Sequence, residues 1–190
     1  MTSLPRVTGL ILAGGAGRRV GCRDKGLIQW RGKPLVAHVA QRLQPQVEQL
    51  LISCNRNSAQ YQHYAKTTMA DTRRDFQGPL AGLEAAAPYI DTAYLVVVAC
   101  DNPALPGDLV QRLLAPLLDI ANTGANISYA HDGERGQYLC AAMHRQCLTS
   151  LTAYLDAGHR TVRHWYQSQH SVAVDFSDEA QCFCNFNHLN

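Results

Sequence analysis

The segment of residues 12–25, with the sequence LAGGAGRRVGCRDK, holds four glycines, three arginines and one lysine directly behind an apolar run. Glycine lets backbone N–H groups come close to phosphate oxygens, and arginine and lysine donate charge-assisted hydrogen bonds to them. The segment therefore indicates a loop that holds a polyphosphate, with a solvated surface turn as the alternative. It matches neither common phosphate motif. G-x-G-x-x-G would need glycine at Val20, and G-x-x-x-x-G-K-[ST] has no placement because Asp24 precedes Lys25 and Pro34 follows Lys33.

A second chemical feature is Asp101, which follows the most hydrophobic run of the chain, residues 94–99. A carboxylate at the end of a buried strand can hold Mg²⁺, which proteins usually bind through one or two carboxylates and substrate phosphates. The alternative is that Asp101 caps the helix that follows Pro103. Because the glycine-rich segment offers a phosphate site, we favour the metal role.

Strands must position both features, and the chain alternates short apolar runs with longer helix-like segments. The runs at residues 9–13, 49–53 and 94–99 are typical of parallel strands buried on both faces. Residues 34–43 and 78–89 between them are predicted to be crossover helices. Further on, we expect helices at residues 106–118 and 147–155 and strands at 127–130, 138–143 and 171–176. This order predicts an α/β fold in one domain, residues 1–190, with ligands beyond the carboxyl ends of the strands.

The composition argues against several classes of partner. The 17 basic and 15 acidic residues give a net charge of +2, so we expect no nucleic-acid partner. No apolar run reaches the length of a membrane span and no secretory leader is recognised, so we expect no membrane contact and a cytoplasmic location. The seven cysteines are predicted to be reduced structural thiols, since only Cys182 and Cys184 come near a metal-ligand spacing and no second pair accompanies them.

The pattern L-A-G-G-x-x-x-R-x-G-x-x-D-K, formed by residues 12–25, resembles the signature of nucleotidyltransferases that use a nucleoside triphosphate and release pyrophosphate. Within this superfamily the chain is most similar to the molybdenum cofactor guanylyltransferases. Further similar stretches, in the same order, are residues 26–27, 32–35, 55–56, 78–82, 100–103, 131–135, 173–178 and 185–187. The chain departs from the family at Val20, usually methionine, at Ser53, usually asparagine, at residues 137–138, which lack a proline, and at His188, usually threonine.

The resemblance implies an open three-layer α/β sandwich with a mostly parallel, Rossmann-like sheet. It also implies transfer of GMP from GTP to molybdopterin, with Mg²⁺ as the cofactor at Asp101 and with Lys25 and Arg19 drawing charge from the β- and γ-phosphates. The residues implied for the nucleotide are Leu12, Ala13, Gly14, Gly15, Lys25, Ser53, Asp71 and Asp101. Asn185 and Asn187 would hold molybdopterin, which gives a GTP-binding half at about residues 1–105 and a molybdopterin-binding half at about residues 106–190. We expect a monomer that makes transient contact with molybdenum-insertion proteins or molybdoenzyme chaperones.

Two alternatives stay open at this point. A molybdopterin cytidylyltransferase, which uses CTP, shares most of these residues but tends to have L-A-A-G where residues 12–15 read L-A-G-G. The additional glycine removes a methyl group beside the base, which favours guanine. The other alternative is a GTP-binding adaptor without catalytic activity. Lys25 and Asp101 together argue against an adaptor, since binding alone needs no metal that bridges the phosphates.

Overall fold

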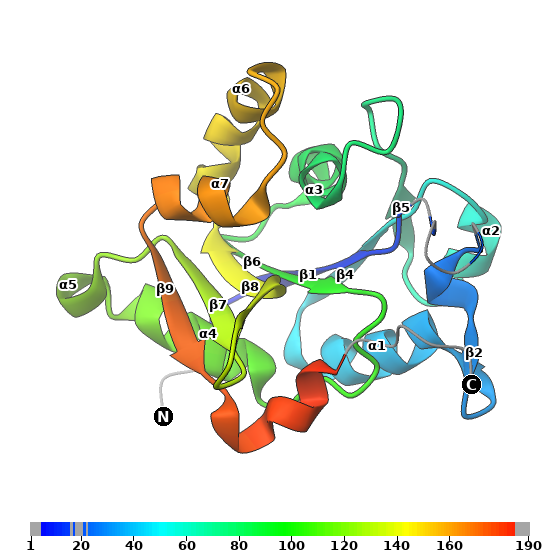
Figure 1. Cartoon of the computed structure of the whole chain (residues 1–190), viewed down its shortest axis with the longest axis horizontal. Coiled ribbons are helices and arrows are strands. Elements are labelled where there is room, and N and C mark those ends of the chain that lie inside the picture. The colour runs from blue at the N-terminus through cyan, green and yellow to red at the C-terminus, as the bar shows by residue number, and fades with distance from the viewer. Residues whose placement is uncertain (1–4, 16, 18–20, 22, 185–190) are drawn as a thin grey trace.

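A seven-stranded sheet runs through the protein in the order β5-β4-β1-β6-β8-β7-β9 (Figure 1). The computed structural model describes residues 5–15, 17, 21 and 23–184. The strands are β1 (Val7–Leu12), β4 (Gln49–Ser53), β5 (Thr67–Met69), β6 (Tyr94–Ala99), β7 (Ile127–His131), β8 (Gly136–His144) and β9 (Ser171–Asp175). Neighbouring strands are parallel except where β8 pairs antiparallel with both β6 and β7. The predicted mostly parallel α/β sheet is therefore confirmed.

Helices cover both faces of the sheet and complete a three-layer sandwich. On one face lie α1 (Leu35–Leu43) and α4 (Leu109–Leu118), and on the other lie α3 (Pro79–Ala86), α6 (Leu151–Asp156) and α7 (Val162–Ser168) (Figure 1). Successive side chains of a strand point to opposite faces, so Ile11 of β1 joins the core under α1 while Leu10 joins the core under α3. Strands buried on both faces explain why the apolar runs were nearly continuous.

The remaining elements are short. They are the two-stranded hairpin of β2 (Gln29–Trp30) and β3 (Lys33–Pro34), the one-turn helices α2 (Ser58–Tyr61) and α5 (Ile120–Thr123), and the 3-10 segments η2 (Lys25–Leu27), η3 (Gln44–Gln46), η4 (Ala87–Tyr89), η5 (Arg145–Ser150) and η6 (Ser177–Phe183). Two of these elements lie near the carboxyl ends of the parallel strands β1, β4 and β6. The segment η2 comes after β1 in the chain, and α2 comes after β4.

The predicted strands at residues 49–53 and 94–99 agree with β4 and β6 at both ends. The helix predicted at residues 147–155 is wrong in its first part, because residues 145–150 form the 3-10 segment η5 and only α6 is α-helical. The hydroxyls of Thr149 and Ser150 donate to the carbonyl oxygens of Gln146 and Cys147, three residues back. Such local side-chain bonds compete with regular α-helix and are compatible with tight 3-10 turns.

The structure bears on what the sequence predicted for the cysteines and for membrane-spanning helices. The six cysteines within the described residues are free thiols, and Cys54, Cys100, Cys140 and Cys147 are buried. Burial raises the pKa of the Cys54 thiol to about 11, which keeps it protonated and unreactive at neutral pH. Cys182 lies on η6, and Cys184 directly follows this segment. Among the described residues, no helix combines the length and apolar character needed to cross a membrane.

Candidate active site

A cavity of about 400 Å³ opens where the parallel strands β1, β4 and β6 end. Ligands of open α/β sheets bind beyond the carboxyl ends of the strands, and the cavity occupies that position. Eight residues singled out in the sequence line it: Leu12, Ala13, Gly14, Gly15, Lys25, Ser53, Asp71 and Asp101. The fold thus brings together side chains from the ends of three strands and from the loops behind them. Arg19, Asn185 and Asn187 lie outside the described residues.

An ion pair joins Lys25 and Asp101 inside this cavity. The Lys25 Nζ lies 2.5 Å from Asp101 Oδ2, although the two residues are 76 positions apart in the chain. Their side chains are only 25% and 14% exposed, so the two charges interact where water screens them weakly. Lys25 begins η2 and Asp101 follows β6 by two residues. A cation and a carboxylate held together in this way can meet a phosphate and its metal ion.

The position of Lys25 depends on its neighbour Asp24, which is anchored to α2. The hydroxyl of Tyr61 donates to Asp24 Oδ1, and Asn57 Nδ2 donates to Asp24 Oδ2 at 3.0 Å. Tyr61 is fully buried and lies so close to Gly26 that any β-carbon there would meet its hydroxyl oxygen. Burial, and then the bond to Asp24, raise the pKa of Tyr61 and keep the phenol protonated as a donor. Sequence reasoning missed this anchor, because no local pattern links Tyr61 to Asp24.

The glycine-rich loop is held from the end of β4. Asn55 Nδ2 donates to the carbonyl oxygen of Gly14 at 2.8 Å, and Arg56 Nη2 donates to the carbonyl oxygen of Gly15 at 3.2 Å. Gly17 has a positive φ of 65°, and a β-carbon there would meet the carbonyl oxygen of Arg23. Glycine is therefore required at position 17, where the loop folds back against the backbone of Arg23.

One backbone amide expected to face the ligand has another partner. The Ala13 N–H donates to the carbonyl oxygen of Ser53 at 2.8 Å and so extends the pairing of β1 with β4 by one residue. Ala13 can therefore offer its carbonyl group and side chain to the cavity, but its N–H is already bonded. The backbone donors that we expect to face a ligand are then the N–H groups of the glycines that follow Ala13.

Asp71 is a half-buried carboxylate on the other wall of the cavity. It accepts from Asn55 Nδ2 at 2.8 Å and from Ser53 Oγ at 3.4 Å, and its own N–H donates to Asn55 Oδ1 at 2.8 Å. Burial raises the pKa of Asp71, and the bonds from Asn55 and Ser53 oppose that shift. The serine at position 53, where the resembling family usually has asparagine, thus keeps a hydrogen-bonding role.

The floor of the cavity depends on close approach of α3 to the sheet. A β-carbon at Gly82 would lie 2.6 Å from Ser53 Oγ, nearer than real contacts allow, and 3.0 Å from Leu12 Cδ2, which would also have to shift. Glycine at this position lets α3 pack directly against the ends of β1 and β4, which closes the cavity from below.

Asp101 is the residue of the cavity best suited to a metal ion. Among the described residues, no group of three or more histidine, cysteine or acidic side chains could enclose one. A single carboxylate, partly buried at a strand end and next to the glycine-rich loop, has the chemistry to hold Mg²⁺ that takes its other ligands from substrate phosphates and water. The ordinary metal cage is therefore excluded for the described part of the chain, whereas a substrate-borne magnesium ion fits.

The comparisons with known proteins agree with this geometry. A family profile described as the MobA-like NTP transferase domain matches residues 9–173. The chain belongs to the MobA-like NTP transferase family. Two curated relatives are the molybdenum cofactor guanylyltransferases of Shewanella loihica and Shewanella frigidimarina, each 41% identical to this chain, with 96% of this chain and 92% of the relative covered.

A solved structure shows the same fold for the family. Molybdopterin-guanine dinucleotide biosynthesis protein A from Archaeoglobus fulgidus superposes with a TM-score of 0.75 at 21% identity, covering 95% of this chain and 92% of that one. The open α/β sandwich that the resemblance to nucleotidyltransferases implied is thereby confirmed.

Proposed function

We propose that this protein transfers GMP from GTP to molybdopterin and releases pyrophosphate. The observation that carries the proposal is the meeting of Lys25, Asp101 and Asp71 in one cavity behind the glycine-rich loop. Membership in a nucleotidyltransferase family, with relatives named molybdenum cofactor guanylyltransferase, supports the reaction class and the two substrates.

The reaction joins two anions, so the residues of the cavity act mainly by positioning and by stabilising charge. The terminal phosphate of molybdopterin attacks the α-phosphorus of GTP, the bond between that phosphorus and the β-bridging oxygen breaks, and pyrophosphate leaves. A phosphate monoester is already ionised near neutral pH, so no residue needs to act as a general base. Lys25, together with Arg19, donates hydrogen bonds to the β- and γ-phosphates as their charge develops.

Asp101 would hold Mg²⁺ together with the triphosphate. When bound, this ion supplies Lewis-acid stabilisation of the phosphate oxygens. Lys25 Nζ and Asp101 Oδ2 are 2.5 Å apart, which supports neighbouring roles for a lysine that binds phosphate and a carboxylate that binds the metal ion. The amides of Gly14 and Gly15, beyond the bonded Ala13 N–H, are the backbone donors that we assign to phosphate.

Asp71 is the residue that we assign to the guanine base. Guanine presents the N1–H and the 2-amino group as adjacent donors, and an ionised carboxylate accepts from both. Asn55 and Ser53 hold the Asp71 carboxylate in place and leave it on the cavity wall. Cytosine presents no such pair of adjacent donors, so the carboxylate favours GTP over CTP.

Gly14 supports the same choice between GTP and CTP. A β-carbon at this position would lie 2.8 Å from Asn55 Nδ2 and 3.6 Å from Asp71 Oδ1. The alanine of the cytidylyltransferase-like L-A-A-G pattern would therefore displace Asn55, and with it the carboxylate that Asn55 holds. A non-catalytic adaptor is disfavoured because the Lys25–Asp101 pair serves phosphate transfer rather than recognition of the base.

The proposal is tested by incubating the protein with molybdopterin, Mg²⁺ and either GTP, CTP or ATP, and by measuring pyrophosphate and the dinucleotide product. We expect both products when the nucleotide is GTP and neither product when it is CTP or ATP. Calorimetric titration with the three nucleotides in Mg²⁺ provides the binding preference independently of catalysis. Products formed from CTP in place of GTP would support the cytidylyltransferase, and GTP binding without any product would support the adaptor.

A further inference from the structure

The loop between β5 and α3, residues 70–78, forms the base-side wall of the cavity and carries an exposed aromatic side chain. Phe76 lines the cavity together with Asp71 of the same loop. Phe76 is 45% exposed, and it is the one cavity-lining residue among the large apolar side chains exposed in the described part of the chain. A phenyl ring at a cavity wall, with water on one side, is placed to receive a flat apolar surface.

The backbone of the loop at Phe76 is unusual. Asp75 and Phe76 have positive φ values of 69° and 50°, a left-handed conformation that L-residues with a β-carbon rarely adopt. Such conformations persist where surrounding contacts impose them. Contacts that hold this loop lie just before and just after Phe76.

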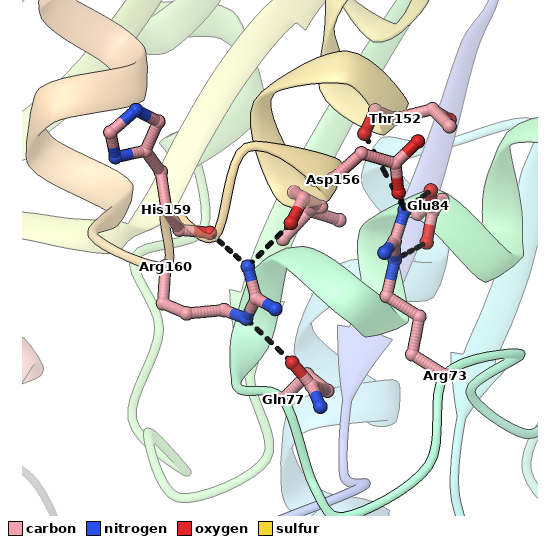
Figure 2. Close-up of polar contacts among 8 residues, drawn as sticks. Arg73, Gln77, Glu84, Thr152, Asp156, His159 and Arg160 are labelled. Carbon is pink, nitrogen blue, oxygen red and sulfur yellow. Dashed lines mark hydrogen bonds and ion pairs between the residues drawn. The ribbon is translucent and has the colours of Figure 1, made fainter.

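Arg73 anchors the loop before Phe76. Its Nε and Nη2 donate to the two carboxylate oxygens of Glu84 on α3 at 2.6 and 2.8 Å, and its Nη2 also reaches Asp156 Oδ1 on α6 at 2.7 Å (Figure 2). The hydrogen bond from Arg73 lowers the pKa of Glu84, so this contact stays charged at neutral pH. One guanidinium thereby ties the loop to two helices.

Arg160 anchors the loop after Phe76. Its Nε donates to Gln77 Oε1 at 2.7 Å, while its Nη1 donates to the carbonyl oxygens of Leu155 and His159 at 2.7 and 2.6 Å (Figure 2). Arg160 lies between α6 and α7, in the second half of the chain. The two arginines therefore hold the segment around Phe76 against the sheet face that α3, α6 and α7 cover. Because Arg160 and Asp156 belong to the second half of the chain, that half helps to hold one wall of the cavity in place.

We propose that Phe76 stacks on the nucleotide base and that Arg73 and Arg160 are positioning residues that hold its ring at the cavity. The inference deepens the proposed function and rests on it, because it assumes that a nucleoside triphosphate occupies this cavity. The ring covers a face of the base, Asp71 accepts from its edge, and the triphosphate extends toward Lys25 and Asp101. Every base has a face that can stack, so Phe76 provides affinity while Asp71 provides the choice of base.

The first test is calorimetric titration with GTP and Mg²⁺ of the wild-type protein and of Phe76→Ala, Phe76→Leu and Phe76→Trp. Base stacking on an aromatic side chain corresponds to roughly a 5- to 100-fold change in affinity, so we expect that loss in Phe76→Ala. Phe76→Leu should recover only part of it, and Phe76→Trp should bind within about threefold of wild type. Tyr89→Ala, which removes another exposed aromatic ring outside the cavity lining, is the matched control.

A spectroscopic signature accompanies the affinities. Guanine stacked on the indole of Phe76→Trp should quench its emission on titration with GTP, beyond any change seen in wild type, whose tryptophans are Trp30 and the fully buried Trp165. If wild type binds GTP but Phe76→Ala binds within about twofold of it, or if GTP leaves the emission of Phe76→Trp unchanged, stacking by Phe76 is overturned. Failure of wild type itself to bind GTP would instead overturn the proposed function.

The positioning role is tested by combining variants. Arg160→Ala should weaken GTP binding less than Phe76→Ala, and the double variant should bind no more weakly than Phe76→Ala alone, because Arg160 acts through the ring. Arg163→Ala, an exposed arginine of α7, is the matched control. If the two losses multiply in the double variant, the positioning role of Arg160 is overturned.

Discussion

Lys25 and Asp101 could each be predicted from the sequence as candidate site residues, Lys25 because it ends the glycine-rich segment and Asp101 because it follows a buried apolar run. Their mutual contact at 2.5 Å could not, since it joins two loops 76 residues apart. The same holds for Asp71, whose carboxylate is held by Asn55 and Ser53 at the end of a different strand. Single residues at strand ends are visible in a sequence, whereas the hydrogen bonds that orient them depend on which loops the sheet brings together.

Lys25→Ala should lower kcat/KM for GTP about 10- to 100-fold, because a hydrogen bond from a charged group contributes about 1.5–3 kcal/mol in a site shielded from water. Lys33→Ala removes the same charge from an exposed position on β3 and serves as the control. Steady-state kinetics with varied GTP measures both. A loss of less than about threefold in Lys25→Ala would contradict the phosphate role.

Asp101→Asn keeps the shape of the side chain and its capacity to accept from Lys25, but it removes the charge that would hold Mg²⁺. We expect GTP binding to persist while kcat falls roughly 100-fold or more, as expected when one group that stabilises transition-state charge is lost. Activity measured across a Mg²⁺ titration, with the exposed Asp108→Asn as control, provides the readout. Unchanged activity with unchanged Mg²⁺ dependence would exclude the metal role.

Asp71 gives the site a predictable pH dependence. Its pKa is raised by burial, so GTP affinity should fall as the pH drops through that raised value, because the protonated carboxyl no longer accepts from both guanine donors. The same pKa shift has the opposite effect on the free energy of unfolding, which it raises at low pH. The folded state holds the proton more tightly than the unfolded state, so this contribution to the free energy of unfolding is present below the unfolded pKa and is lost as the pH rises through the folded pKa.

Asp71→Asn should therefore leave the free energy of unfolding at neutral pH unchanged or slightly higher, while GTP binds about 10- to 100-fold more weakly. The asparagine can still accept from Asn55 and can donate its amide to Ser53 Oγ, so the fold keeps its contacts. Titrations with GTP at several pH values, with the exposed Asp91→Asn as control, measure the effect. A pH step in GTP affinity that persists in Asp71→Asn belongs to another group.

At the scale of elements, the sequence predicts those strands and helices that carry a strong pattern. The strands β1, β4 and β6 are apolar on both faces, and α1 and α4 repeat their apolar residues at helical spacing. The strand β5 was not predicted, because its three residues include two threonines and its place comes only from pairing with β4. The helix α7 was missed as well, because its apolar residues at helical spacing, Val162, Trp165 and Tyr166, span little more than one turn.

The short helix α2 illustrates an element whose value to the site is invisible in the sequence. Its Tyr61 holds Asp24, and Asp24 directly precedes Lys25. Tyr61→Phe removes a buried donor to a carboxylate, so we expect the free energy of unfolding to fall by about 1–3 kcal/mol. We also expect KM for GTP to rise at temperatures where the variant is fully folded, because the segment that carries Lys25 loses its anchor.

Thermal unfolding and steady-state kinetics of Tyr61→Phe, with the exposed Tyr89→Phe as control, check both effects. A variant that is destabilised but has an unchanged KM would show that Tyr61 supports the fold alone. A variant with unchanged stability would show that the hydroxyl bond to Asp24 contributes nothing to the folded state.

At the scale of the whole molecule, one continuous sheet links the two regions of the chain. The antiparallel strand β8 pairs directly with β6, and Leu139 of β8 lines the same cavity as Asp101. The sequence could not predict this insertion, because an apolar run does not indicate its neighbour or direction in the sheet. The second region therefore contributes to the wall of the nucleotide cavity as well as to its own surface, and the assignment of one substrate to each half stays a prediction.

Asn187→Ala tests that assignment. The resemblance to guanylyltransferases places Asn185 and Asn187 with the pterin, and an amide matches the donors and acceptors of a neutral pterin ring. Losing one such partner leaves a polar group of the ligand unpaired, which costs about 1–3 kcal/mol and should weaken molybdopterin binding roughly tenfold. GTP should bind with nearly the wild-type dissociation constant, because Lys25, Asp71 and Asp101 belong to the first region.

Paired titrations of Asn187→Ala with GTP and with molybdopterin measure the two affinities on one protein. The exposed Asn122→Ala, which removes an amide on α5, is the matched control and should bind both ligands as wild type does. Lys25→Ala provides the converse case, with GTP binding weakened and molybdopterin binding retained. If Asn187→Ala weakens GTP binding as much as molybdopterin binding, the substrates do not occupy separate halves. His188, which stands where the family usually has threonine, would then be the next position to vary.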